Sequence, residues 1–219
     1  MTRALPHLGA FTPATQRRPA LEFLPGLVLA RDRLHEFCGP ARRTLALWAA
    51  RGCEGAVVWI GPWRPDGALC PAGIHPFIEP GRLILAAGKT ADEQLWAAEE
   101  ALRSGAVGLV VADLAEAPGL TPVRRLHLAA GEGAEAARHL GLVAVPGLLL
   151  LPGDGGAPGV ESRWYLAPRH RAGESEWQLE RRRARGEPPA AWRLTGAPER
   201  PRLAPAPQTD AEAQAVTGK

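Results

Sequence analysis

The chain has 219 residues, 46% of them hydrophobic, and a formal net charge of only +3. This is enough apolar sequence for a buried core, and it excludes a wholly disordered chain, a collagen-like chain and a small disulfide-stabilised protein. The small net charge does not by itself indicate a nucleic-acid partner.

The basic residues are almost all arginine, because the only lysines are Lys89 and Lys219. Genomic base composition explains this bias, and phosphate or carboxylate binding by the guanidinium group is the alternative. The three cysteines form no CxxC pair, and the histidines form no HxH or HExxH pattern, so we expect reduced thiols and no metal site.

The ends of the chain differ in composition from its middle. Residues 1–24 are predicted to be an N-terminal arm, 25–195 an α/β domain, and 196–219 a disordered, Pro-rich tail that cannot bury enough surface to fold. No signal peptide is expected, and the longest apolar run, 142–151, contains Pro146 and is too short to span a membrane. These features predict a soluble, cytoplasmic protein.

Apolar runs and helical spacing predict the elements of the middle region. In chain order they are a strand at 34–37, a helix at 44–51, strands at 56–60 and 82–86, a helix at 91–103, a strand at 107–112, a helix starting at Thr121-Pro122, a strand at 148–151 and two strands at 162–166 and 176–181. The alternation predicts a mostly parallel central sheet flanked by helices, and the last two strands predict an antiparallel hairpin at the sheet edge.

Two helix starts have specific capping signals. Thr90 and Glu93 form a T-x-x-E capping box before the helix at 91–103, and Gly105 should end it. Thr121 should be the N-cap of the next helix, with Pro122 at its first position. Residues 88–90 read GKT, as in a phosphate loop, but the motif also needs a glycine where Leu83 stands, so we expect a loop and an N-cap there.

The sequence RLHEFCGPARRTLALWAAR, residues 33–51, begins like a nucleotide-binding loop. A strand leads to Gly39-Pro40, and a helix starts near Thr44. Only three residues, 41–43, separate Pro40 from Thr44, and the lysine that contacts the terminal phosphates is absent.

These stretches resemble the RecA family. GPARRTLALWAA is similar to the RecA P-loop with its middle deleted, and ALRSGAVGLVVADL, which ends near Asp113, resembles the strand that carries the magnesium-linked aspartate. HEFCGPARRTLALW, LWAAEEALRSGAVGLVVADL, LTPVRRLHLAA and GDGGAPGVESRWYLAP are together similar to ImuA, the RecA-like family of bacterial SOS mutagenesis cassettes. The resemblance runs from Leu34 to Trp192.

The resemblance implies a RecA-like fold with a degenerate P-loop. Gly39, Pro40, Thr44 and Asp113 would be remnants of the nucleotide site, with no cofactor and no ATP hydrolysis, because Trp63 stands about where RecA has its catalytic glutamate. Asp113 could instead cap the end of its strand. The loop at 152–159 is short compared with the loop that grips single-stranded DNA in RecA.

The resemblance also implies a function: a non-catalytic adaptor in error-prone translesion synthesis after DNA damage. The implied partners are an ImuB-like Y-family polymerase homologue and an error-prone C-family DNA polymerase, with RecA itself as a further candidate. A SulA-like inhibitor of cell division and a diverged ATPase that uses Lys89 or the Arg42/Arg43 pair are the alternatives.

The run LERRRARGEPPAAW is the most basic part of the chain. Arg181, Arg182, Arg183 and Arg185 lie close to Trp177 and Trp192, and together they could contact a nucleic-acid backbone by charge and stacking. The alternative is a solvent-facing strand and turn.

Overall fold

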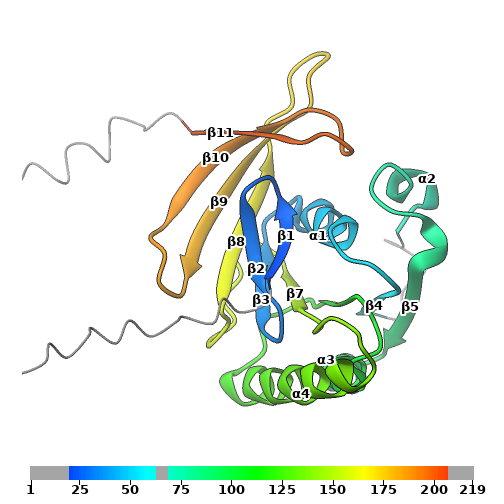
Figure 1. Cartoon of the computed structure of the whole chain (residues 1–219). Coiled ribbons are helices and arrows are strands. Elements are labelled where there is room, and N and C mark those ends of the chain that lie inside the picture. Colours follow the sequence, from blue (N-terminus) through cyan, green and yellow to red (C-terminus); the bar gives the residue numbers. More distant parts are fainter. Residues whose placement is uncertain (1–19, 63–68, 207–219) are drawn as a thin grey trace, which may run out of the picture.

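A computed structural model describes residues 20–62 and 69–206. A nine-stranded mixed sheet crosses the molecule, and a separate two-stranded hairpin packs against it (Figure 1). The strands are β1 (Ala20–Leu24), β2 (Leu27–Ala30), β3 (Leu34–Cys38), β4 (Val57–Pro62), β5 (Leu83–Gly88), β6 (Leu109–Asp113), β7 (Gly147–Leu151), β8 (Ser162–Pro168), β9 (Glu176–Ala184), β10 (Ala190–Thr195) and β11 (Arg202–Pro205). The helices are α1 (Arg42–Arg51), α2 (Pro71–Ile74), the 3-10 turn η1 (Pro80–Arg82), α3 (Ala91–Ser104) and α4 (Leu120–His139).

The large sheet has the order β11-β10-β9-β8-β3-β7-β6-β4-β5. Its strands from β8 to β5 pair in parallel, which confirms the predicted mostly parallel α/β sheet. Every residue of β3, β6 and β7 is buried, as expected for parallel strands covered on both faces. Helices α1 and α2 pack on one face, and α3 and α4 on the other, so two apolar clusters share the same strands.

The predicted hairpin at 162–166 and 176–181 is confirmed, but it is longer and lies inside the sheet. Strands β8 and β9 are antiparallel with a bulge, and β10 and β11 extend the antiparallel part beyond them. Figure 1 shows these four strands in yellow to red curving away from the parallel strands.

The predicted arm at 1–24 is wrong at its inner end, because β1 belongs to the fold. β1 and β2 form an antiparallel hairpin with alternating exposed and buried residues. Leu21, Phe23 and Leu24 are buried, and the Phe23 ring lies 5.0 Å from that of Trp164. Residues 1–19 lie outside the described part of the chain.

The predicted tail at 196–219 is also wrong at its inner end. Strand β11 pairs with β10, Leu203 packs against the core, and the indole N–H of Trp48 donates to the carbonyl of Pro198 at 3.0 Å. One large aliphatic residue, Leu203, is enough here because the neighbouring strand β10 supplies the backbone partners. The rest of that prediction, 207–219, lies outside the described residues.

Helix ends agree with the sequence where a side chain caps them. Thr90 accepts from the N–H of Glu93, and Gly105 ends α3 in the left-handed conformation, as predicted. The prediction for Thr121 is wrong: Gly119 is the N-cap of α4, and Thr121 lies inside its first turn. Pro122 still fits there, since first-turn N–H groups have no partner within the helix. No helix in the described ranges is long and apolar enough to cross a membrane.

Candidate functional site

The turn after β3 lies at the carboxyl end of the parallel strands, the edge where ligands bind in open α/β sheets. Gly39 has φ 90°, and a Cβ there would lie 2.6 Å from the carbonyl oxygen of Leu166. Its N–H donates to Gly153 at 2.9 Å, and the N–H of Ala41 donates to Leu166 at 3.0 Å. The N–H of Arg42 bonds back to Gly39, so these three donors point at protein carbonyls.

Asp113 lies at the end of β6, two strands away from β3, and faces the start of α1. Its carboxylate is buried, and it accepts from Nε of Arg43 at 2.5 Å, with a nitrogen of Arg42 3.7 Å away. Arg42 and Arg43 lie in the first turn of α1, where the positive end of the helix dipole repels their charge. The negative charge of Asp113 offsets this repulsion. The turn that contains Gly39, Pro40 and Thr44 is therefore joined to Asp113 by Arg42 and Arg43, which lie between Pro40 and Thr44 in the sequence.

The loop at 152–159 is fastened to the sheet by Glu36, a residue that the sequence analysis did not single out. This carboxylate is fully buried in β3, and it accepts from the N–H groups of Gly156 and Ala157, both at 2.9 Å, and from Nε of Arg163 at 2.7 Å. Gly155 has no room for a side chain, because a Cβ would meet the carboxylate. A charged residue between His35 and Phe37 in a predicted strand was the available signal.

The segment GKT at 88–90 is a structural turn, as predicted. Thr90 caps α3, and the N–H of Lys89 donates to the Glu93 carboxylate at 2.7 Å. The amide of Gln94 donates to the carbonyl of Gly88 at 3.0 Å. These contacts use the groups that a phosphate loop would present to its ligand.

The four arginines between 181 and 185 do not form one surface. Arg181 bonds to Glu187, and its guanidinium lies 5.7 and 5.5 Å from the ring centres of Trp164 and Trp192. Arg182 pairs with Asp154 at 2.7 Å and lies 3.7 Å above the ring of Tyr165. Only Arg183 and Arg185 of the four are exposed, which leaves two side chains for the predicted nucleic-acid contact.

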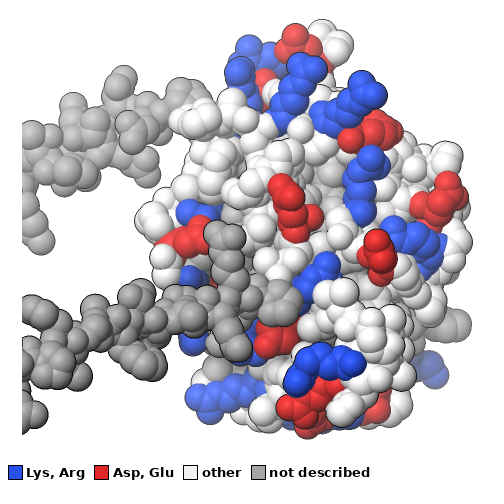
Figure 2. Space-filling model, viewed as in Figure 1, with Lys and Arg blue, Asp and Glu red and all other residues white. Residues whose placement is uncertain are grey.

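The tryptophans near this run serve the core. Trp164 and Trp177 are buried, and Trp192 is partly buried and stacks on Trp164 with ring centres 5.8 Å apart. Trp63 lies outside the described residues. Acidic and basic side chains are interspersed over the face shown in Figure 2. A continuous basic stripe is therefore not present on the part of that face that the structure describes.

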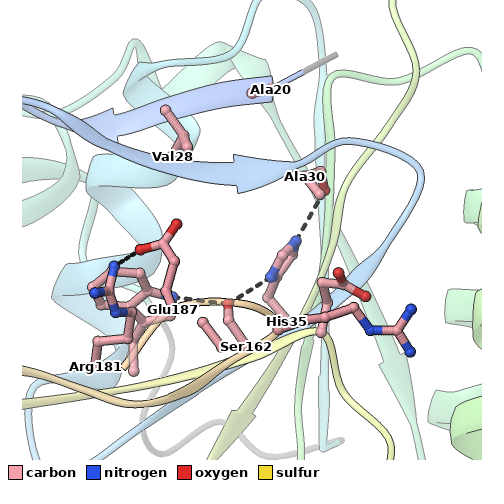
Figure 3. Close-up of a pocket in the computed structure, with 11 residues that line it drawn as sticks. Ala20, Val28, Ala30, His35, Ser162, Arg181 and Glu187 are labelled. Atoms are coloured by element: carbon pink, nitrogen blue, oxygen red, sulfur yellow. Dashed lines mark hydrogen bonds and ion pairs between the residues drawn. The ribbon is translucent and has the colours of Figure 1, made fainter. Parts of the chain in front are cut away.

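A cavity of about 210 Å³ lies between the β1–β2 hairpin and strands β8 and β9 (Figure 3). At its inner end the Ser162 Oγ lies 2.7 Å from Nδ1 of His35, and it accepts from the indole N–H of Trp164 at 2.8 Å. Nε2 of His35 lies 2.9 Å from the carbonyl of Ala30, which can only accept, so Nε2 carries the proton and Nδ1 accepts from the serine.

Burial lowers the pKa of His35 from 6.5 to about 4, so the ring is neutral near pH 7. The neutral His35 ring of β3 bonds to Ala30 of β2 and to Ser162 of β8, so its role is to connect these three strands. No role was predicted for His35 from the sequence, and the signal available was an ionisable residue in a short strand that also contains Leu34, Phe37 and Cys38.

The three cysteines are free: Cys38 and Cys53 are buried and Cys70 is exposed. Burial raises the pKa of Cys38 to about 12 and that of Cys53 to about 11. Within the described residues no cluster of His, Cys, Asp and Glu could hold a metal ion. Comparison of the chain with protein-family models and with curated proteins found no match.

Proposed function

We propose that this protein is a non-catalytic, RecA-like accessory protein that supports error-prone translesion synthesis through contacts with other proteins. The observation that carries the proposal is the meeting of Asp113 with Arg42 and Arg43. The two stretches that resemble the P-loop and the magnesium-linked strand are separated by about 70 positions in sequence, yet they lie together, as a diverged RecA-like site requires.

The same contacts argue against nucleotide chemistry at this place. A P-loop binds phosphates with free backbone N–H groups and a lysine. Here the N–H groups of Gly39, Ala41 and Arg42 donate to protein carbonyls, and the aspartate that would serve magnesium is paired with arginine. Binding MgATP would require all of these contacts to break.

The loop at 152–159 is held in place by the rest of the fold, which favours an adaptor function over a protein that forms filaments and binds single-stranded DNA with this loop. Two of its N–H groups, those of Gly156 and Ala157, donate to Glu36, and Asp154 pairs with Arg182. The expected partners are the ImuB-like polymerase homologue, the error-prone C-family polymerase and RecA, which the protein would contact with its folded surface.

Thermal melting with and without MgATP tests the nucleotide part of the proposal. A ligand at 100 times its dissociation constant raises the free energy of unfolding by roughly 2.7 kcal/mol, which a melt resolves easily. We expect no shift and no ATP hydrolysis above background. A clear shift that disappears in Arg42→Ala or Lys89→Ala would instead favour the diverged ATPase.

Pull-down with purified partners tests the adaptor part. The ImuB-like protein should retain the full-length chain at moderate salt. Filamentation of cells on overexpression, without such binding, would favour the SulA-like division inhibitor and contradict the proposal.

A further inference from the structure

Strand β5 forms one end of the nine-stranded sheet, and in the described residues its outer edge pairs with no other strand. Its sequence, LILAAG, contains no proline and no charge. An open edge of this kind is a template for pairing with another strand, and natural proteins normally protect it.

The opposite end of the same sheet is protected in the usual way. Strand β11 is short, it begins with Arg202 and ends with Pro205, and Pro201 precedes it. Proline lacks the N–H that an added strand would need. Among the described residues, therefore, one end of the sheet is blocked and the other is open.

Apolar side chains flank the open edge on both faces of the sheet. Ile84 is 51% exposed on the side of α3, beside Val58 of β4, and Leu85 is 62% exposed on the opposite side, beside Trp59. A helix laid on one face would cover only one of them. An additional strand would cover both and would also satisfy the backbone groups of β5.

We propose that β5 pairs antiparallel with β5 of a second copy of this chain, around a two-fold axis, to form one continuous sheet. The sequence of β5 is complementary to itself in one register. With Leu85 opposite Leu85 of the second copy, Ile84 lies opposite Ala86 and Leu83 opposite Ala87, so that each remaining large side chain meets a small one. A two-fold interface is closed and leaves no further open edge at β5.

The charges that flank β5 favour the antiparallel direction. Glu79 precedes the strand and is 76% exposed, and the exposed Lys89 follows it. Antiparallel pairing brings Lys89 of one copy toward Glu79 of the other, whereas parallel pairing would place Lys89 beside Lys89 and Glu79 beside Glu79. Arg82, between them, is turned toward the carbonyls of Gly55 and Cys53.

Sedimentation of the full chain over a range of concentrations tests the pairing. We expect a reversible dimer, and Leu85→Lys should weaken it at least about tenfold, because like charges would then lie directly opposite each other. Leu128→Lys is the matched control, since Leu128 is 67% exposed on α4; it should leave the dimer unchanged. A wild-type chain that remains monomeric overturns the proposal, as does a dimer that Leu85→Lys leaves intact.

Cross-linking tests the register. In a Cys70→Ser background the remaining cysteines, Cys38 and Cys53, are buried. Mild oxidation should then join two copies of Leu85→Cys through a disulfide, and two copies of Ile84→Cys at least about tenfold more slowly. Residues directly opposite each other have Cβ atoms about 4.5–5.5 Å apart, whereas diagonal neighbours lie about 7–8 Å apart, which is too far for a disulfide. Equal rates at the two positions, or no link at position 85, would overturn this register.

Discussion

Glu36 shows how a single buried charge can organise a loop. Its carboxylate has three donors, one of them the guanidinium of Arg163. Replacing Glu36 by Gln keeps the size of the side chain but leaves Arg163 without its charged partner. We expect the free energy of unfolding to fall by about 3 kcal/mol, as when one member of a buried ion pair is removed.

Urea denaturation measures this loss, and Asp154→Asn is the matched control. The Asp154 side chain is 86% exposed and also pairs with an arginine. An exposed pair of this kind is worth less than about 1 kcal/mol. Equal effects of the two substitutions would mean that Glu36 does not hold the loop.

His35 should make stability depend on pH. Its pKa is lowered from 6.5 to about 4 by burial, so between these values the unfolded chain binds a proton that the folded chain does not. The free energy of unfolding should therefore rise with pH over this window, by up to about 3 kcal/mol at about 1.4 kcal/mol per pKa unit, and the His35 contribution should be lost as the pH falls toward 4.

Denaturation of the wild type and of His35→Gln at a series of pH values isolates this contribution. Burial also lowers the pKa of His127, so the difference between the two proteins is the measured quantity. That difference should shrink as the pH falls from 6.5 to 4. A constant difference would show that His35 is not buried as a neutral ring.

At the scale of elements, strand β11 makes the first part of the predicted tail a member of the sheet. Truncation after residue 195 removes the pairing of β11 with β10 and the contact between Trp48 and Pro198. It also exposes Leu194, which is fully buried. We expect this truncation to lower the melting temperature by several degrees, since a loss of about 1 kcal/mol corresponds to roughly 2–4 °C in a chain of this size.

Truncation after residue 206 is the control, because it keeps every described contact of β11. Scanning calorimetry of the three proteins is sufficient. If both truncated chains melt like the wild type, the strand contributes nothing to stability.

At the scale of the whole molecule, the two apolar clusters should unfold together because they share the strands of one sheet. The buried tryptophans Trp48, Trp59, Trp164 and Trp177 all belong to the cluster on the α1 face. Leu126 belongs to the other cluster, beneath α4. Leu126→Ala should cost about 2–5 kcal/mol and shift the tryptophan fluorescence transition as much as the far-UV circular dichroism transition.

The exposed Leu128 on the same helix provides the matched control, and Leu128→Ala should shift neither transition. A circular dichroism transition that moves while the fluorescence transition stays in place would mean that the two faces unfold separately.

The sequence by itself determined the elements whose signals are local. Apolar runs mark the parallel strands, and the Thr90 and Glu93 capping box with Gly105 marks both ends of α3, because hydrogen bonds within a few residues set these boundaries. The alternation of strands and helices predicted the parallel sheet, because a helix between two strands makes the crossover that parallel pairing needs.

The tertiary structure alone decided which partners long-range groups find. The ends of the domain were misplaced because β1 and β11 are short strands, of five and four residues, that gain stability from the strands and core beside them. The pairing of Asp113 with Arg42 and Arg43, and of Glu36 with a loop about 120 residues away, could not be predicted from spacing. Local sequence determines backbone preference, whereas the burial of a charge depends on which segments the fold brings together.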